Sequence, residues 1–425
     1  MGGGVGKMPV SWQVPDTEIA DRWPRVPDKV RHVGDSVAAV VAEDPYVAAD
    51  ALELIEVDYE VLEATIGAKA TTEDGKPLVH DEIENNISFK WGLGDREACD
   101  KAFEEADHVV KLDLINQRLI ANAMEPRACA AQWTAATENM TVWTTSQNPH
   151  IIRFGLSAVT LPMLDEHKLR VISPDVGGGF GSKIFHYPEE VIIPWIAKEI
   201  NRPCKWVATR SEFFMTDSQG RDHVQNCKMA LTSDGIITGL YVELHADMGA
   251  YLSSIAPLIP TVICITLFSG LYKNPGIWGE TTGTLTNTVP VDAYRGAGRP
   301  EASYLVERLV DVAAQELKMD PIEIRRKNFI GKDEFPYQTP VAFLYDSGDY
   351  HAMFDKLEEN GDYKGMRAAQ VKAKEDGRLI GIGVGGSVEA SGYGPAATVG
   401  ALGFYGGMWE RSEEHTSELQ SHLNL

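Results

Sequence analysis

The segment Ser173–Lys183, SPDVGGGFGSK, surrounds one phenylalanine, Phe180, with four glycines and therefore limits what the chain can build around it. The pattern predicts a strand before it, in KLRVIS, and a helix after it, in PEEVIIPWIAKEINRP. Main-chain N–H groups that neither element pairs can point at a ligand, and the missing Cβ atoms let that ligand touch the main chain. The ring of Phe180 can be held against the same ligand. A tight turn packed on a neighbouring helix is the alternative interpretation of this motif alone.

Two common phosphate-binding loops do not match this chain. From Gly177 or Gly179, the spacing never satisfies the dinucleotide fingerprint GxGxxG. Near the N-terminus, GGGVGK has Met1 where the first glycine of a P-loop belongs, and Met8 replaces its Ser or Thr. We therefore expect neither type of nucleotide site.

Charge and hydropathy exclude two classes of partner. The 425 residues carry a formal net charge of −23, which argues against nucleic acid or an anionic membrane surface. The longest apolar run, Ile255–Leu271, is interrupted by Pro257 and Pro260, whereas a bilayer span needs about 20 apolar residues. We expect no membrane span, and a buried, loop-rich wall at this run.

The cysteines form no CxxC pair, so neither an iron–sulfur cluster nor a structural zinc site is encoded locally. We expect them to be buried small hydrophobic residues. Their odd number and the missing signal peptide predict a reducing, cytoplasmic compartment. The five are Cys99, Cys129, Cys204, Cys227 and Cys264.

The last fifteen residues, 411–425, share neither periodicity nor composition with the chain before them. They read like a translated sequencing-library adapter, and we expect them to be an artefactual tail. On this interpretation the chain is truncated at its C-terminus. The chain also enters the first domain late, which predicts truncation at both ends.

Residues 30–63 predict an α+β unit. SVAAVVAE indicates a buried strand, DPYVAADALELI a helix that starts at Asp-Pro, and EVDYEVLEA a half-exposed strand. The polar stretch 70–86 predicts a domain boundary.

Strands and helices continue to alternate further along the chain. Helices are expected in DREACDKAFEEAD and NPHIIRFGLSAVTL, and strands in HVVKLDLINQRL and on both sides of the turn in ACAAQWTAATENMTVWTTSQ. RPEASYLVERLVDVAAQELKMDP predicts an amphipathic helix with Leu305, Leu309 and Ala313 on one face. The glycine-rich stretch from Leu379 is expected to open a further domain with a strand.

Four motifs stand in a fixed order: NQRLIANAMEPRA (116–128), TTSQNPHIIR (144–153), DVGGGFGSK (175–183) and VDAYRGAGRPEASYLVERLVD (291–311). Together they resemble the large, molybdopterin-binding subunit of the xanthine dehydrogenase and aerobic carbon monoxide dehydrogenase family. The likeness covers nearly all of residues 29–405. It implies an α+β fold with a partial α/β hammerhead domain in residues 1–80. A first molybdopterin-binding domain in 90–345 and the start of a second in 346–410 would follow.

The resemblance also implies cofactor-binding residues. In the family, the glycine loop and a preceding glutamine lie beside the molybdenum, which is carried on a pyranopterin. The matching positions here are Gln117 and the loop residues Gly178, Gly179, Phe180 and Gly181. Such an anionic cofactor needs donors from the main chain at contact distance.

Other residues of the same motifs have less certain roles. Arg295 is a candidate for orienting the substrate or cofactor through its fork of donors. For Gln147 and His150, a helix cap or a core hydrogen bond explains the side chain equally well.

The substrate pocket is expected to include Ile184, Gly296 and Ala297. Family members that oxidise carbon monoxide carry a copper-binding cysteine after the arginine, where this chain has Gly296. Without that thiolate, Cu(I) lacks its soft ligand. Purine-oxidising members place a glutamate after the loop lysine, where this chain has Ile184. An aldehyde or an aromatic heterocycle is therefore the favoured substrate.

The resemblance implies a molybdenum hydroxylase that takes its oxygen from water. Electrons would pass to Fe–S and FAD partner subunits in a dimerised heterotrimer, and the cofactor could be the cytosine dinucleotide form. The general-base glutamate is expected in the absent C-terminal part, so this chain alone should be inactive. A carbon monoxide dehydrogenase and a non-catalytic binding or assembly subunit remain the alternatives.

Overall fold

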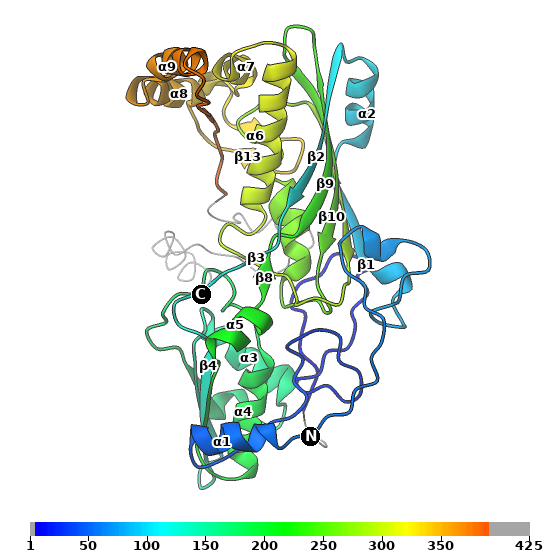
Figure 1. Cartoon of the computed structure of the whole chain (residues 1–425), viewed down its shortest axis with the longest axis vertical. Helices are drawn as coiled ribbons and strands as arrows, with labels where there is room; N and C mark the ends of the chain where they lie inside the picture. The colour runs from blue at the N-terminus through cyan, green and yellow to red at the C-terminus, as the bar shows by residue number, and fades with distance from the viewer. Residues whose placement is uncertain (1–4, 391–425) are drawn as a thin grey trace, which may run out of the picture.

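The computed structural model describes residues 5–390, which form an elongated molecule with two lobes joined at a narrow waist (Figure 1). Each lobe has its own hydrophobic core. We call them the five-stranded lobe and the four-stranded lobe, after their sheets. The observed mixture of sheets and helices agrees with the predicted α+β class.

The five-stranded lobe contains a sheet of order β1-β11-β10-β9-β2. All neighbours are antiparallel except β10 and β11, which run parallel. Helix α2 packs on β10 and β11, and α6 packs on β2 and β9. The elements are β1 (Ile87–Gly94), α2 (Arg96–Glu104), β2 (His108–Asn116), β9 (His223–Leu231), β10 (Ile237–Asp247), β11 (Gly276–Thr284) and α6 (Arg299–Glu316).

Helix α6 has the predicted amphipathic face, because Leu305, Leu309 and Ala313 are all fully buried. The wall at 255–271 is likewise buried and is built from short irregular turns. Further along the chain lie α7 (Pro321–Asn328), β12 (Tyr337–Gln338), β13 (Leu344–Tyr345), α8 (Tyr350–Asn360) and α9 (Tyr363–Glu375). The short 3-10 and π turns are Ala70–Thr72, Glu84–Asn86, Leu156–Thr160, Glu166–Lys168, Ala256–Leu258, Ile259–Ile263 and Lys332–Glu334.

The four-stranded lobe contains a sheet of order β6-β5-β4-β7, with helix α4 packed on β4 and β7. The predicted hairpin is formed by β4 and β5. The helices predicted after it, α3 and α4, also form where the sequence indicated. The elements are β4 (Ala128–Thr134), β5 (Asn139–Thr144), α3 (Pro149–Gly155), β6 (Leu169–Ile172), α4 (Pro188–Glu199), β7 (Cys204–Val207) and α5 (Arg210–Thr216).

At the waist, the two-residue strands β3 (Leu119–Ile120) and β8 (Gln219–Gly220) pair antiparallel between the lobes (Figure 1). The glycine loop, residues 177–181, lies in the connection from β6 to α4. No helix within residues 5–390 is long and apolar enough to cross a membrane.

Residues 30–63 depart from the predicted order of strand, helix and strand. Helix α1 (Pro45–Glu53) forms and is capped by Asp44, whose carboxylate accepts from the Tyr46 and Val47 amides. Both strands predicted on either side of it, at 36–43 and 56–64, are absent, so those predictions were wrong. A strand needs a neighbouring chain for its hydrogen bonds, and no described strand pairs with these runs.

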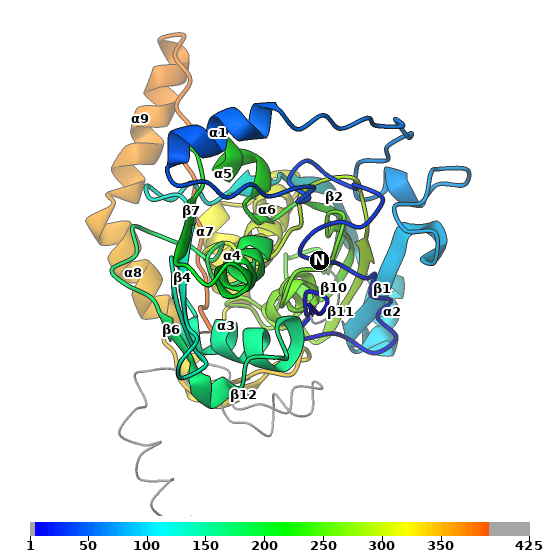
Figure 2. The ribbon, with the colours of Figure 1, turned by 90° about the horizontal axis from the view of Figure 1, so that it is seen from below.

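The run at 36–43 instead borders a cavity of about 950 Å³, which separates it from β4, β7 and α4. Seen from below, α1 lies at the outer edge of the molecule beside α5 (Figure 2). The strand expected from Leu379 is also absent up to residue 390, and the remainder of that stretch lies outside the described residues.

Candidate functional site

The glycine loop adopts a backbone that favours glycine. The φ angles of Gly178, Phe180 and Gly181 are +94°, +54° and +106°, all in the left-handed half of conformational space. A Cβ on Gly181 would overlap the carbonyl of Ala293, and one on Gly179 would overlap the side chain of Gln147. Protein atoms therefore account for the missing side chains at these two glycines.

Three of the predicted motifs meet at this loop, although they are far apart in sequence. Gly177 N–H donates to Glu125 Oε2 at 2.7 Å, and Gly181 N–H donates to Gln147 Oε1 at 3.0 Å. On the other side, Arg295 N–H donates to the Phe180 carbonyl at 2.8 Å. The order of motifs seen in the sequence thus becomes a single cluster in space.

Two main-chain donors of the loop are left over. Among the described residues, the N–H groups of Gly179 and Phe180 donate to no protein acceptor. The Phe180 ring is 41% exposed, and the exposed guanidinium of Arg295 makes no ion pair within residues 5–390. Unpaired amides and an unpaired cation on adjoining segments form a donor set for an anionic ligand.

Gln117, the other predicted cofactor residue, lies at the waist between β2 and β3 and is exposed. No described hydrogen bond joins it to the glycine loop. Its neighbour Arg118 is anchored, because the guanidinium donates to Asp222 Oδ2 at 2.5 Å and to the Val289 carbonyl at 2.7 Å. The structure therefore fixes the backbone from which Gln117 projects.

The predicted substrate residues come from the two segments joined by the bond from Arg295 to Phe180: Ile184 follows the glycine loop, and Gly296 and Ala297 follow Arg295. Ile184 is partly buried against the core of the five-stranded lobe, and its N–H donates to the Gly181 carbonyl at 3.1 Å. Gly296 has a φ of +96°, and a Cβ there would overlap the Pro300 ring. Ala297 packs against the same core as Ile184, with its N–H donating to the Tyr294 carbonyl at 2.7 Å.

Sequence reasoning left Gln147 open and did not single out Glu125 or Lys183 as anchors. The structure gives Gln147 a definite place on the glycine loop, whereas His150 is exposed on α3 and makes no described contact with that loop. Lys183 Nζ is fully buried and donates to the Glu125 carbonyl at 2.7 Å. Burial lowers the pKa of Lys183, and the hydrogen bond to Glu125 opposes that shift.

A buried ion-pair cluster holds the C-terminal end of the loop. Arg127 contacts Glu189 at 2.6 Å and Asp217 at 2.5 Å, and its guanidinium lies 3.8 Å from the centre of the Tyr187 ring. Tyr187 in turn donates its hydroxyl to the Ser182 carbonyl at 2.6 Å. Burial alone would lower the pKa of Arg127, but its partners, Glu189 foremost, raise it well above the ordinary value. Arg127 is part of a predicted motif, yet its distant partners could not be read from the sequence.

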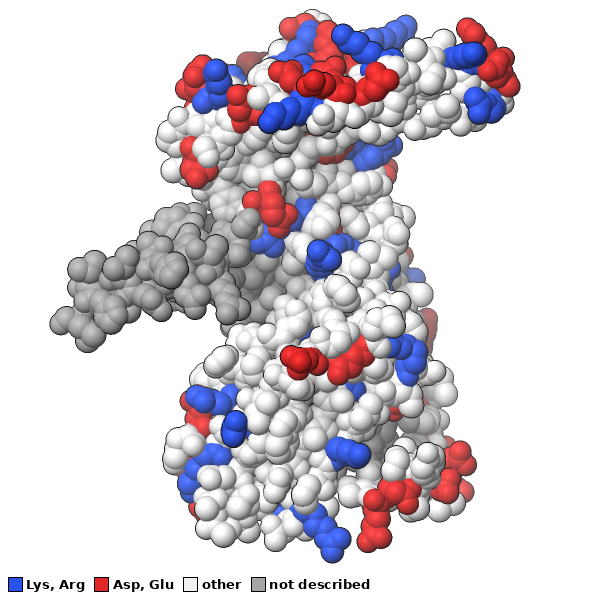
Figure 3. Space-filling model, turned by 90° about the vertical axis from the view of Figure 1, so that its left-hand side faces the viewer, with Lys and Arg blue, Asp and Glu red and all other residues white. Residues whose placement is uncertain are grey.

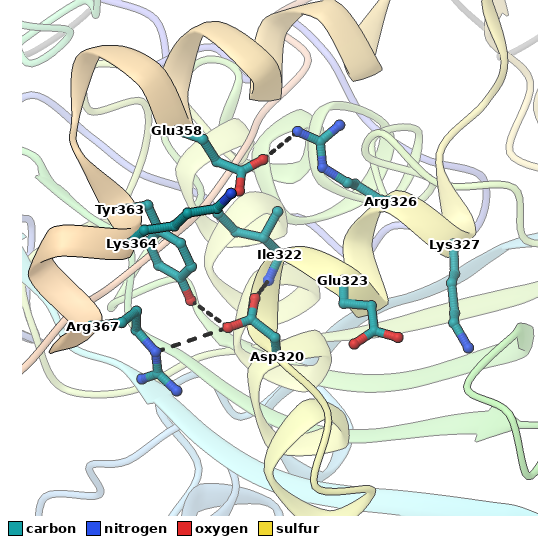
Figure 4. A pocket seen from close by; sticks show the side chains of 9 residues that line it. All are labelled: Asp320, Ile322, Glu323, Arg326, Lys327, Glu358, Tyr363, Lys364 and Arg367. Carbon is teal, nitrogen blue, oxygen red and sulfur yellow. Dashed lines mark hydrogen bonds and ion pairs between the residues drawn. The ribbon is translucent and has the colours of Figure 1, made fainter. Parts of the chain in front are cut away.

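A second recess, of about 660 Å³, lies between α7 and the α8–α9 hairpin (Figure 4). Several of its charged groups have partners within it: Arg326 contacts Glu358 at 2.5 Å, and Asp320 accepts from the Tyr363 hydroxyl at 2.9 Å. Charged side chains of both signs crowd this end of the molecule and are sparser over the waist (Figure 3). We interpret the recess as a helix-packing contact rather than a reaction site.

Two family models match the chain. "Molybdopterin cofactor-binding domain" matches residues 79–329, and "Aldehyde oxidase and xanthine dehydrogenase, a/b hammerhead domain" matches residues 12–63. The first covers more than half of the chain. The glycine loop and all the anchors described above fall inside it.

Similar proteins include the carbon monoxide dehydrogenase large chain of Hydrogenophaga pseudoflava, with 36% identity over 91% of this chain and 50% of the relative. The nicotine 6-hydroxylase large subunit of Paenarthrobacter nicotinovorans is 33% identical over 86% of this chain and 44% of its own length. Among solved structures, quinoline 2-oxidoreductase from Pseudomonas putida 86 matches with a TM-score of 0.82 and 29% identity, over 88% of this chain and 47% of that one. The chain spans about half the length of the curated relatives it matches.

Proposed function

Since the chain belongs to the molybdopterin-binding large subunits of the xanthine dehydrogenase and aerobic carbon monoxide dehydrogenase family, we propose that the full-length protein is a molybdenum hydroxylase acting on an aldehyde or an aromatic heterocycle. The observation that carries the proposal is the pair of unpaired amides, Gly179 and Phe180, on a loop whose Phe180 carbonyl accepts from the N–H of Arg295, a residue with an unpaired guanidinium.

The residues present fit an anionic pterin cofactor. The N–H groups of Gly179 and Phe180 have no protein acceptor among the described residues, and Arg295 adds a fork of charged donors. These groups, together with Gln117, would hold the cofactor. When bound, the cofactor supplies the oxidising capacity for converting a C–H bond into C–OH with oxygen from water.

This chain's own residues have a second task, which is to fix the donors. Gln147 and Glu125 each accept from one loop amide, and these bonds fix the loop on both sides of the central two N–H groups. Phe180 is 41% exposed, and its ring offers an apolar surface for a flat substrate or cofactor.

The substrate class follows from Gly296 and Ile184. No thiolate stands at position 296, and a side chain there would have to avoid Pro300 in a backbone conformation that favours glycine. An apolar Ile184 favours an apolar substrate over a purine. Names such as nicotine 6-hydroxylase and quinoline 2-oxidoreductase among the similar proteins support a heterocycle.

Carbon monoxide oxidation is the second candidate, because two similar proteins are named carbon monoxide dehydrogenase large chains, at 36% and 34% identity. The absence of a cysteine at position 296 argues against copper-dependent chemistry of this kind in the present protein.

Electron transfer is proposed to use Fe–S and FAD partner subunits in a dimerised heterotrimer. No cluster of three or more metal-ligating side chains is found among residues 5–390, and the similar proteins are named as large chains or subunits of complexes. We also propose the cytosine dinucleotide form of the cofactor and a cytoplasmic location, the latter because all five cysteines are free thiols. The general-base glutamate is proposed to lie outside this chain.

The test uses the full-length protein purified with its partner subunits. We expect about one molybdenum per large chain, dye reduction with aldehydes or N-heterocycles, and ¹⁸O from labelled water in the product. Carbon monoxide-dependent dye reduction with copper in the protein would favour the second candidate. A well-folded complex without molybdenum would contradict the proposal and favour a non-catalytic binding or assembly subunit.

A further inference from the structure

The turn that joins β8 to β9 consists of Arg221 and Asp222, two consecutive non-glycine residues with φ angles of +68° and +64°. A left-handed backbone of this kind is strained for an L-amino acid. Such strain persists where the surrounding structure requires it, and it is concentrated at functional sites. The contacts of the two side chains show what the turn holds in place.

Arg221 is buried and grips the 293–298 loop. Its guanidinium donates to the Tyr294 carbonyl at 3.1 Å and to the Arg295 carbonyl at 2.9 Å. The charge is matched by the fully buried Glu301, 3.1 Å away. Because the N–H of Arg295 also bonds to the Phe180 carbonyl, this fork fixes the segment that carries Arg295 against the glycine loop.

Asp222 reaches in the other direction. Its Oδ2 accepts from Arg118 Nε at 2.5 Å, and Arg118 also contacts Asp247 at 3.3 Å and the Thr288 hydroxyl at 2.8 Å. Arg118 directly follows Gln117 in the chain. The second half of the turn therefore fixes the backbone from which Gln117 projects.

We propose that the Arg221–Asp222 turn is a shared brace that positions two cofactor-facing side chains, Arg295 through Arg221 and Gln117 through Asp222. Neither brace residue touches the ligand in this assignment, so both are positioning residues. The cofactor role rests on the proposed function, whereas the mechanical role rests on the contacts alone.

The test uses R221K and D222N. R221K keeps the charge beside Glu301 but removes the planar fork that spans two carbonyls. D222N keeps a residue that tolerates the left-handed backbone, so it removes the charge and leaves the turn. The matched control is R325K, because Arg325 is also buried and pairs with Glu307 at 2.9 Å and Asp311 at 2.8 Å, between α6 and α7.

The first readout needs no cofactor. Amide hydrogen exchange of the 425-residue chain is followed by mass spectrometry. Exchange should become about tenfold faster in residues 293–298 for R221K and in 117–120 for D222N, the change expected when a charge-assisted contact is weakened by about 1.4 kcal/mol. R325K should leave both segments unchanged. Unchanged exchange in both brace variants, or equal acceleration in R325K, overturns the brace.

The second readout is molybdenum retention by the full-length protein with its partner subunits. Loss of an outer-shell partner is expected to weaken retention about 10–100-fold in R221K and D222N, with R325K close to wild type. If exchange is faster in R221K and D222N but the full-length wild-type protein never contains molybdenum, the proposed function and the cofactor role are contradicted. The mechanical brace then still stands. Molybdenum-loaded variants with normal retention would overturn the cofactor-positioning role of the brace and leave the proposed function intact.

Discussion

The glycine loop at residues 177–181 and the N-terminal segment at residues 54–63 differ in how much of the chain holds them. The loop is tied by hydrogen bonds to Glu125, Gln147 and Arg295, which come from three distant parts of the sequence. In the N-terminal segment, Leu54 and Val61 are 83% and 90% exposed. The difference teaches that an irregular loop can be rigid when its polar groups find partners, whereas a strand-like sequence without a paired neighbour does not become a strand.

The largest effect that the comparison predicts is at Arg127, beside the loop. In R127A, Glu189 and Asp217 lose the cation between them, which leaves buried carboxylates uncompensated. Breaking a buried pair in this way costs about 3–5 kcal/mol. Urea unfolding should register a loss of that size. R153A, which removes a pair that is over 40% exposed on both sides, should lose no more than about 1 kcal/mol; equal losses would refute the special status of the loop anchors.

The second effect concerns the loop backbone itself. In G181A, the new methyl group meets the Ala293 carbonyl at a φ of +106°, so left-handed strain and overpacking together should cost roughly 2–4 kcal/mol. Gly377 is the matched control, because it has a φ of +75° with nothing within 4 Å of a Cβ. G377A should lose only the backbone penalty, about 1–2 kcal/mol. Identical unfolding midpoints would mean that the contact with Ala293 is absent in solution.

The same contrast explains what could be predicted from the sequence. Helices α1, α4 and α6 form where expected, because their hydrogen bonds, their proline starts and, for α6, the apolar stripe are local. The strands expected at 36–43 and 56–64 required a neighbouring strand as a hydrogen-bond partner, which no local pattern supplies.

For the site, the family resemblance predicted which motifs lie near the cofactor, but it did not predict the hydrogen bonds and ion pairs between them. It could not indicate that Gln147 would fill the space above Gly179, nor that Arg127 would find Glu189 and Asp217. These contacts depend on the packing of both lobes, which the one-dimensional pattern does not encode. The assignments of Gln117 and Arg295 to the cofactor stay predictions.

A pH-dependent effect separates two buried groups near the waist. Burial lowers the pKa of His223 to about 3, so its contribution to stability is present above the unfolded pKa of 6.5 and declines as the pH falls below it. Burial raises the pKa of Asp292 to about 7, so its contribution is present below the unfolded pKa of 3.8 and declines as the pH rises toward 7. Between pH 4 and 6.5 the two contributions oppose each other, each with a slope of up to about 1.4 kcal/mol per pH unit.

Single substitutions should therefore expose the slopes. Relative to wild type, the free energy of unfolding of H223Q should fall with rising pH between pH 5 and 6, and that of D292N should rise. Urea titrations at these two pH values give the slopes directly. If both variants follow the wild-type profile, the two side chains are hydrated rather than buried, and water reaches the interior near the waist in solution.

The smallest effect is expected in the N-terminal segment, and it decides whether residues 54–63 are exposed in solution. V61T replaces one methyl group by a hydroxyl of the same shape at a side chain that is 90% exposed, so the free energy of unfolding should change by no more than about 0.5 kcal/mol. V142T makes the same exchange at a fully buried position of β5, where an unpaired hydroxyl should cost about 1–3 kcal/mol. Equal losses in the two variants would mean that the segment around Val61 is buried as a strand. The glycine loop and residues 54–63 would then both be held by hydrogen bonds, and the contrast between them would be wrong.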